Sequence, residues 1–111
     1  MIDKSGTLAR TITLVECGEF LISDHGLDES SEDGFLGSEA IAGVADARIV
    51  EDYPNAFKGL SVLVLQHDDT GQPLHVVWGL PKGLGNPAVL VTAYRPRRGQ
   101  WTANFMERVP K

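Results

Sequence analysis

Three side chains of types used for proton transfer and substrate orientation stand inside two apolar stretches in the second half of the chain. His75 lies in the first stretch, and Thr92 and Tyr94 lie in the second. A histidine near its ordinary pKa can give or take a proton, and hydroxyl groups can orient a substrate or stabilise charge. Arg95 ends the second stretch, and a guanidinium there could hold a phosphate. These are the parts of a metal-free site that cleaves a phosphodiester after deprotonating a 2′-hydroxyl.

His25 is a second side chain that could transfer a proton. It stands near the start of a polar stretch, Asp24–Asp33, which the sequence predicts to be a short helix with Ser23 as its N-cap. At a helix N-terminus the dipole lowers the pKa of a histidine. The other interpretation of His25 is a solvated residue at a helix end, and a third histidine, His67, is interpreted as turn surface. The proton-transfer group of the predicted site is therefore His25 or His75.

The charges of the chain are divided unequally along its length. The formal net charge is −5, yet the part from Lys82 onward carries six basic residues against Glu107 alone. The first 45 residues carry nine acidic residues against two basic ones. A basic end on an acidic protein is a candidate anion site, and the predicted phosphate-binding residues are Lys82, Arg97 and Arg98. The alternative is that Arg97 and Arg98 form a solvated turn.

Two predicted strands, Leu74–Leu80 and Ala88–Arg95, bring the candidate side chains to one face of a sheet. Side chains alternate between the faces along a strand, so His75 shares a face with Thr92 and Tyr94 when the two strands pair. Paired residues of this kind lie about 4.5–8 Å apart. The opposite sets are expected to meet the helices: Leu74, Val76, Trp78 and Leu80 in one strand, and Val89, Val91, Ala93 and Arg95 in the other. The alternative for the polar set is the solvent-facing side of a half-exposed sheet.

Helices are predicted ahead of the strands. Leu8, Ile12 and Val15 form the stripe of a short amphipathic helix, the polar helix follows, and residues 38–44 form a third. Helices followed by strands indicate an α+β domain, with the helices on one face of an antiparallel sheet. The four strand candidates, in meander order, are Ala47–Tyr53, Leu60–His67, Leu74–Leu80 and Ala88–Arg95.

The length of 111 residues fits a single domain, 1–111. Its helical part is expected at about 5–44, the four-stranded sheet at about 46–96, and a C-terminal tail or short helix at 100–109. No apolar run approaches the ~20 residues of a membrane span, and the N-terminus has no signal-peptide pattern. One cysteine excludes a disulfide within the chain, and three histidines without a cysteine pair give no metal-ligand spacing. We therefore expect a cytoplasmic protein without a metal site or cofactor.

Several segments resemble a bacterial domain family of unknown function that is often encoded beside antitoxins of the zinc-finger plus helix-turn-helix type. The most specific are Leu74–Gly83 (LHVVWGLPKG) and Val89–Pro96 (VLVTAYRP), and the resemblance covers about Leu14 to Arg108. The other segments are Ile22–Gly26, Ala47–Pro54 and Ser61–Gln66, with Trp101 after them. The family is grouped with the barnase, EndoU, colicin and RelE ribonuclease toxins. The resemblance implies their common core, helices followed by a four-stranded antiparallel sheet, and puts His25, His75, Thr92, Tyr94 and Arg95 on recurring polar positions.

Two functions are compatible with these observations. The first is a metal-independent endoribonuclease, the toxin of a toxin–antitoxin pair, whose partners are RNA and an antitoxin of the zinc-finger or helix-turn-helix type. RNA affinity depends on neutralising phosphates, so an acidic chain needs segregated charge to bind RNA, and the basic end supplies it. The second is a non-catalytic module of the same fold that binds a protein through its acidic helical half.

Overall fold

Two α-helices, one 3₁₀ helix and five strands form the regular structure of the residues that are described. The computed structural model describes residues 6–23, 37–53, 59–83, 85–97 and 99–109. The predicted polar helix and His25 lie outside these ranges. The elements in chain order are α1 Thr7–Glu16, β1 Phe20–Ile22, α3 Gly37–Ala42, the 3₁₀ helix Val44–Asp46, β2 Arg48–Tyr53, β3 Gly59–His67, β4 Pro73–Pro81 and β5 Ala88–Tyr94.

The five strands form one mixed sheet in the order β1-β5-β4-β3-β2. Strands β2 to β5 pair antiparallel, as the alternation predicts, so the α+β class is confirmed. The prediction of a purely antiparallel four-stranded meander is wrong, because β1 pairs parallel with β5 at the edge. The N–H of Ala88 donates to Glu19 O at 3.0 Å and that of Ser23 to Leu90 O at 3.0 Å. Strand β1 has only three residues, which is enough to form this pairing but too few for the alternation of apolar and polar residues to predict a strand.

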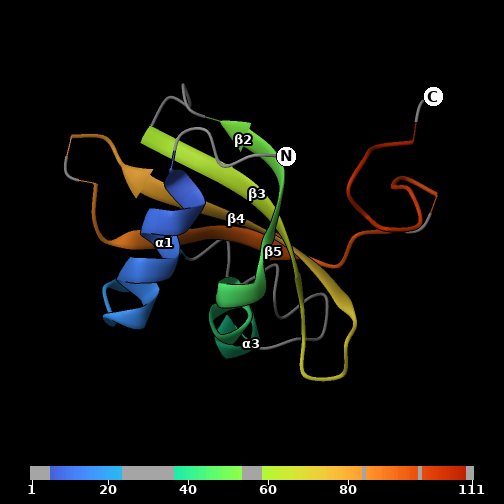
Figure 1. The fold of residues 1–111 in the computed structure, drawn as a ribbon, viewed down its shortest axis with the longest axis horizontal. Helices are drawn as coiled ribbons and strands as arrows, with labels where there is room; N and C mark the ends of the chain where they lie inside the picture. The colour runs from blue at the N-terminus through green and yellow to red at the C-terminus, as the bar shows by residue number, and fades with distance from the viewer. Residues whose placement is uncertain (1–5, 24–36, 54–58, 84, 98, 110–111) are drawn as a thin grey trace.

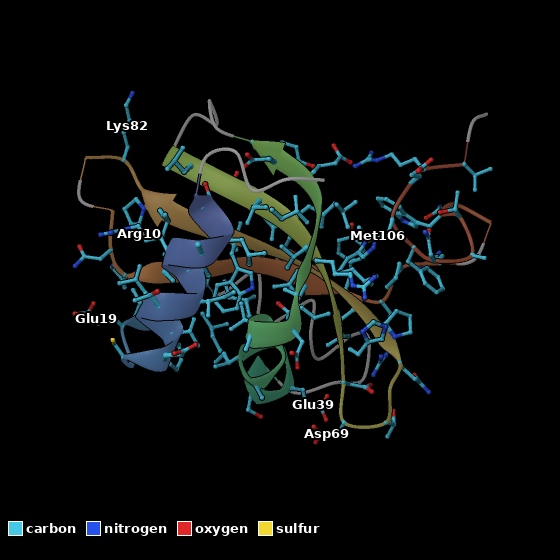
Figure 2. All side chains as sticks on the ribbon, in the orientation of Figure 1. Arg10, Glu19, Glu39, Asp69, Lys82 and Met106 are labelled. Atoms are coloured by element: carbon cyan, nitrogen blue, oxygen red, sulfur yellow. The ribbon has the colours of Figure 1, made fainter. Side chains whose placement is uncertain are left out.

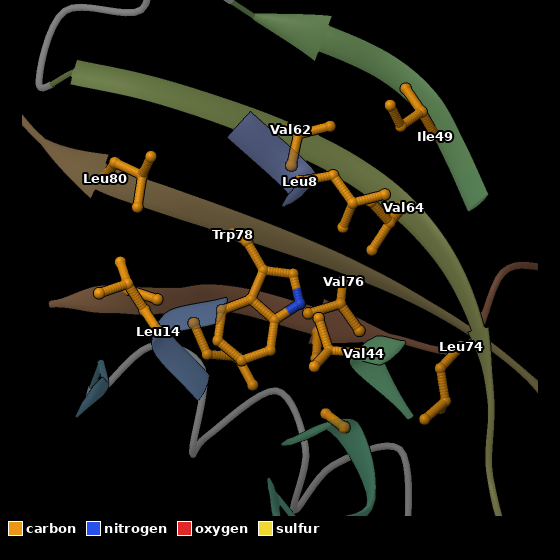
Figure 3. Close-up of a cluster of buried hydrophobic side chains, with 14 residues drawn as sticks. Leu8, Leu14, Val44, Ile49, Val62, Val64, Leu74, Val76, Trp78 and Leu80 are labelled. Atoms are coloured by element: carbon orange, nitrogen blue, oxygen red, sulfur yellow. The ribbon is translucent and has the colours of Figure 1, made fainter. Parts of the chain in front are cut away.

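Helices α1 and α3 lie together on one face of the sheet (Figure 1). Helix α1 ends at Glu16 with Cys17 as its C-cap, and Gly18 follows with φ 78°, a left-handed conformation that glycine adopts without strain. Trp78 of β4 is fully buried at the centre of this layer, among aliphatic side chains from the helices and from neighbouring strands (Figure 3). The predicted helix-facing set of β4 is therefore confirmed: Leu74, Val76, Trp78 and Leu80 all belong to this core.

A buried hydrogen-bond chain ties α3 to the sheet through one glutamine. Gln66 of β3 is 1% exposed, and its Nε2 donates to Ala40 O at 2.6 Å. Its Oε1 accepts from Trp78 Nε1 at 2.9 Å. Each polar group in this chain would be costly to bury without its partner. Gln66 therefore fixes both the orientation of the indole and the position of the helix above it.

We expect Gln66→Leu to lower the free energy of unfolding by about 2–3 kcal/mol, because the indole N–H and the Ala40 carbonyl lose their buried partner. Urea denaturation measures this loss in Gln66→Leu, in Trp78→Phe and in the double variant. Adding Trp78→Phe to Gln66→Leu should cost less than the sum of the two single changes, since the unpaired indole N–H disappears. Strictly additive losses would show that the hydrogen bond contributes nothing.

The opposite face of the sheet is partly covered by the C-terminal segment, Gly99–Val109. This segment contains no helix, so of the two alternatives for residues 100–109 the packed tail is correct. Its side chains Trp101, Phe105 and Met106 pack on a second apolar cluster. From the sheet that cluster takes Val50, Tyr53, Leu63, Leu65 and Val77. Strand β3 is therefore buried on both of its faces, as its apolar run predicts.

An irregularity in the pairing of β4 with β5 changes which side chains of β5 face the helices. Val77 pairs with Thr92, yet the next residue, Trp78, pairs with Leu90, so Val91 is an extra residue. Leu90 therefore packs in the helix-side core beside Ala93, while Val91 is 38% exposed. The prediction that Val89 and Val91 join Ala93 against the helices is wrong, because strict alternation cannot anticipate a bulge.

Candidate functional site

His75, Tyr94 and Thr92 share the face of the sheet that lies opposite the helices. His75 of β4 pairs directly with Tyr94 of β5, and Val77 pairs with Thr92 two residues along. The hydroxyl of Tyr94 lies 3.3 Å from His75 Nδ1, and the two rings meet edge to face. The sheet register thus brings three of the predicted site residues together, and the bulge beyond Thr92 does not disturb them.

His75 is fully buried beneath the C-terminal segment, which the sequence did not predict. Its Nε2 lies 2.8 Å from the carbonyl oxygen of Phe105, and the ring of Trp101 packs against it perpendicularly at 4.3 Å between centroids. Tyr94 itself is only half-buried. Of these two hydrogen-bonded residues, Tyr94 is therefore the one with accessible surface.

The surroundings of His75 keep its ring neutral and assign its proton. Burial lowers the pKa of His75 below the ordinary 6.5, Arg108 lowers it further, and the Phe105 carbonyl and Glu51 oppose the change. A carbonyl oxygen can only accept, so Nε2 carries the proton of the neutral ring and donates to Phe105. Nδ1 is then an acceptor for the hydroxyl of Tyr94.

A charged pair links the C-terminal segment to β2 near His75. Arg108 lies 2.8 Å from the carboxylate of Glu51, and its guanidinium stands over the Trp101 ring at 5.1 Å from the centroid. The Arg108 side chain is 62% exposed, so the pair is a surface pair that holds the segment only weakly. Burial, followed by the neighbouring Glu51 carboxylate, raises the pKa of Tyr53 to about 12.

Arg95 has an internal partner. Its Nη2 donates to Asp68 at 2.8 Å, and its Nη1 donates to the carbonyl of Pro73 at 3.5 Å. The Asp68 carboxylate also accepts from the backbone N–H groups of Thr70 and Gln72 and from the Thr70 hydroxyl. Arg95 therefore braces the turn between β3 and β4, and its charge is balanced there. Its predicted part in phosphate chemistry has no support from this arrangement.

Replacing Asp68 by asparagine should lower the urea midpoint of unfolding at neutral pH. Hydrogen bonds from Thr70 and then from Arg95 hold the pKa of Asp68 well below the ordinary 3.8. A carboxyl whose pKa is depressed by folding stabilises the protein above 3.8, and that contribution disappears as the pH falls through the folded value. The midpoints of Asp68→Asn and the unmodified protein should therefore converge at strongly acidic pH. A difference that does not depend on pH would refute the charge-based explanation, with Asp69→Asn as the control in the same turn.

The predicted phosphate-binding residues do not come together. Lys82 follows the end of β4, whereas Arg97 follows the end of the antiparallel strand β5, so the two lie at opposite ends of the sheet. Figure 2 shows Lys82 far from Met106 of the C-terminal segment. Arg97 is exposed, and Arg98, like His25, lies outside the described residues. The basic end of the sequence is therefore no single surface in the part of the chain that the structure describes.

Four residues around His75 were not predicted from the sequence as part of the site: Glu51, Trp101, Phe105 and Arg108. Two tryptophans in a chain of this length are a weak signal that each is packed, and apolar Phe105-Met106 next to Trp101 hints at a covering segment. The contact of the Phe105 carbonyl with His75 could not be predicted from the sequence, because every residue has a backbone carbonyl. Alternation along β2 predicts that Glu51 and Tyr53 share one face, but it does not predict that Glu51 lies near His75.

Within the described ranges, no three His, Cys, Asp or Glu side chains are grouped so that they could hold a metal ion. A hollow in the C-terminal segment is lined by Gly99, Trp101, Thr102, Ala103 and Phe105. Among the same described residues, none of the helices has the length and apolar character needed to cross a membrane.

These observations define an α+β domain whose helices cover one face of a mixed five-stranded sheet and whose C-terminal segment covers part of the other. The chain belongs to the family described as Domain of unknown function (DUF4258), whose model matches residues 22–95. His75, Thr92, Tyr94 and Arg95 fall inside the matched range, and the C-terminal segment falls outside it. Neither the comparison with curated proteins nor the comparison with solved structures gave a match.

Proposed function

We propose that the protein is a metal-independent endoribonuclease, the toxin of a toxin–antitoxin pair, in which Tyr94 meets the substrate. The observation that carries the proposal is the hydrogen-bonded pair of Tyr94 and His75, with one member half-buried and the other sealed from water. The resemblance to the barnase, EndoU, colicin and RelE toxins supports the same reaction class. Under this proposal RNA and an antitoxin of the zinc-finger or helix-turn-helix type are the partners.

The pair of residues provides a route for the proton of a ribose 2′-hydroxyl. As the 2′-oxygen attacks phosphorus, its proton passes to the oxygen of Tyr94, and the proton of Tyr94 passes to Nδ1 of His75. The new O–P bond forms as the bond to the 5′-oxygen breaks, and that oxygen leaves with a proton from solvent. The products are a 2′,3′-cyclic phosphate and a 5′-hydroxyl. The imidazolium formed on His75 keeps its Nε2–H bond to Phe105.

Two features of the site suit this role. The lowered pKa of His75 keeps the ring neutral at pH 7, so it can accept a proton. The half-buried Thr92 lies beside Tyr94 on the same face, where its hydroxyl can orient a ribose. We assign binding of the substrate phosphate to two exposed arginines. Arg97 follows Tyr94 by three residues in the chain, and Arg108 lies close enough to His75 to lower its pKa.

The test is cleavage of a labelled single-stranded RNA by the purified protein in the presence of EDTA. We expect fragments that end in a 2′,3′-cyclic phosphate, and we expect expression in a bacterial host to slow growth. A folded, unmodified protein that leaves RNA intact and growth unchanged, both alone and with ribosomes, would refute the proposal. Deoxyribose at the cleaved position should block the reaction, because the attacking 2′-hydroxyl is then missing.

A second candidate function, a non-catalytic protein-binding module, is favoured by two other observations. Arg95 is held by Asp68, and both ring nitrogens of His75 have partners inside the protein, as structural polar groups do. Leu21 is 59% exposed next to Val89, its partner in β5, and Val91 is exposed in the same strand. Leu21→Glu with Val91→Glu should abolish capture of a partner if this apolar strip is the contact. Capture that survives the double change would exclude this strip.

A further inference from the structure

The C-terminal segment contains a tightly bonded turn that aims one backbone carbonyl at His75. Asn104 Oδ1 accepts from the Thr102 hydroxyl at 2.7 Å and from the Met106 N–H at 3.1 Å. The Phe105 N–H donates to Thr102 O at 2.8 Å. Phe105 has φ 59°, a left-handed conformation that non-glycine residues rarely adopt. Such a conformation persists where the surrounding bonds enforce it, and it is often found at functional sites.

The position of that carbonyl decides where His75 carries its proton. Phe105 O lies 2.8 Å from Nε2, whereas the Tyr94 hydroxyl, which can donate or accept, lies 3.3 Å from Nδ1. Without a fixed acceptor at Nε2, the neutral ring could carry its proton on either nitrogen. With the acceptor in place, the Nε2–H form is selected and Nδ1 is left to receive the proton of Tyr94.

We propose that the turn from Thr102 to Glu107 is a part of the site that sets the tautomer of His75, with Asn104 as the positioning residue. The side chain of Asn104 does not touch His75. It acts through the backbone of Phe105, whose conformation it holds by accepting hydrogen bonds from Thr102 before it and from Met106 after it. The family model ends at residue 95, so this positioning device lies beyond the matched domain. The role of this tautomer in catalysis rests on the proposed function. The selection of the Nε2–H form by the turn does not depend on it.

Long-range ¹H–¹⁵N NMR correlations of the imidazole nitrogens test the proposal without RNA. Above pH 7, the unmodified protein should show His75 protonated on Nε2 and bare on Nδ1, with His75→Gln identifying the signals. In Asn104→Ala the two nitrogen shifts should move towards each other, as in an exchanging mixture of tautomers. Asn104→Asp keeps an oxygen acceptor and should restore the original spectrum. Gln100→Ala, an amide-to-alanine change in the same segment, should leave it unaltered.

A His75 that is protonated on Nδ1 in the unmodified protein would overturn the proposal. So would an Asn104→Ala spectrum identical to that of the unmodified protein. If Asn104→Ala does not fold, Thr102→Val removes the 2.7 Å donor to the same oxygen and must produce the shift instead. Asn104→Ala should also slow RNA cleavage roughly tenfold, with Asn104→Asp restoring the rate. If the tautomer changes and the cleavage rate does not, the proposed role of Asn104 is supported and the proton relay of the proposed function is refuted.

Discussion

Tyr94→Phe should reduce the rate of RNA cleavage by at least about 100-fold while the protein stays folded. The phenol oxygen is the atom that exchanges protons with both the ribose and His75 in the proposed reaction. Phenylalanine keeps the ring that packs edge to face on the imidazole, so the loss of stability should be small, about 0.5–1.5 kcal/mol. Single-turnover kinetics on a labelled RNA measure the rate, and urea denaturation measures the stability.

The chain offers a matched control, because its only other tyrosine is Tyr53. Tyr53 packs against the same apolar cluster but is not hydrogen-bonded to His75, so Tyr53→Phe should change the cleavage rate by less than about threefold. Equal losses in the two variants would indicate a general effect of removing a hydroxyl. A Tyr94→Phe protein as fast as the unmodified one would eliminate the relay and leave RNA cleavage without its proposed proton acceptor.

Trp101→Ala should produce the largest loss of stability of any change in the C-terminal segment, about 3–4 kcal/mol. The indole is 9% exposed, anchors the second apolar cluster and packs on His75 at 4.3 Å. The same change should raise the pKa of His75 towards 6.5, because burial is the main cause of the lowering and water then reaches the ring. Urea denaturation gives the first quantity, and an NMR titration of His75 gives the second.

Trp101→Phe separates the two effects. A phenyl ring still covers the imidazole, so the pKa of His75 should stay low, while the smaller side chain costs about 1–2 kcal/mol. In the unmodified protein the neutral His75 stabilises the fold above pH 6.5, and this contribution is lost as the pH falls through the lowered folded pKa. Trp101→Ala should flatten that dependence. A His75 pKa that remains low in Trp101→Ala would mean that the segment is not what excludes water.

Periodicity in the sequence was sufficient to predict most of the sheet. The strands from β2 to β5 begin and end within one residue of their predicted limits, because turn residues such as Pro54, Gly71 and Pro96 separate the β-forming stretches of the sequence. The pairing of His75 with Tyr94 followed from the same alternation. The burial of His75 beneath the C-terminal segment did not follow from it. Alternation assigns a side chain to a face, but it does not say whether another part of the chain covers that face.

The remaining differences each have a local cause. A bulge beyond Thr92 reversed the expected placement of Val91, and no sequence pattern marks where such an extra residue falls. The role of Arg95 depends on Asp68, 27 residues earlier in the chain, which becomes its neighbour only when β5 pairs with β4 and brings Arg95 to the β3–β4 turn. The site also uses a backbone carbonyl, which every residue possesses and no sequence pattern can single out.

The pairing of the first strand with the last one has a consequence for the order of folding. The Ser23 hydroxyl donates to Val91 O across 68 residues, and among the strands that the structure describes β1 pairs only with β5. Closing so long a loop is entropically expensive, so local hairpins such as β3–β4 should form before it. During synthesis β1 emerges early and must wait until β5 has left the ribosome. Completion of the sheet is therefore a late event, and until then the outer edge of β5 is open to pairing with another chain.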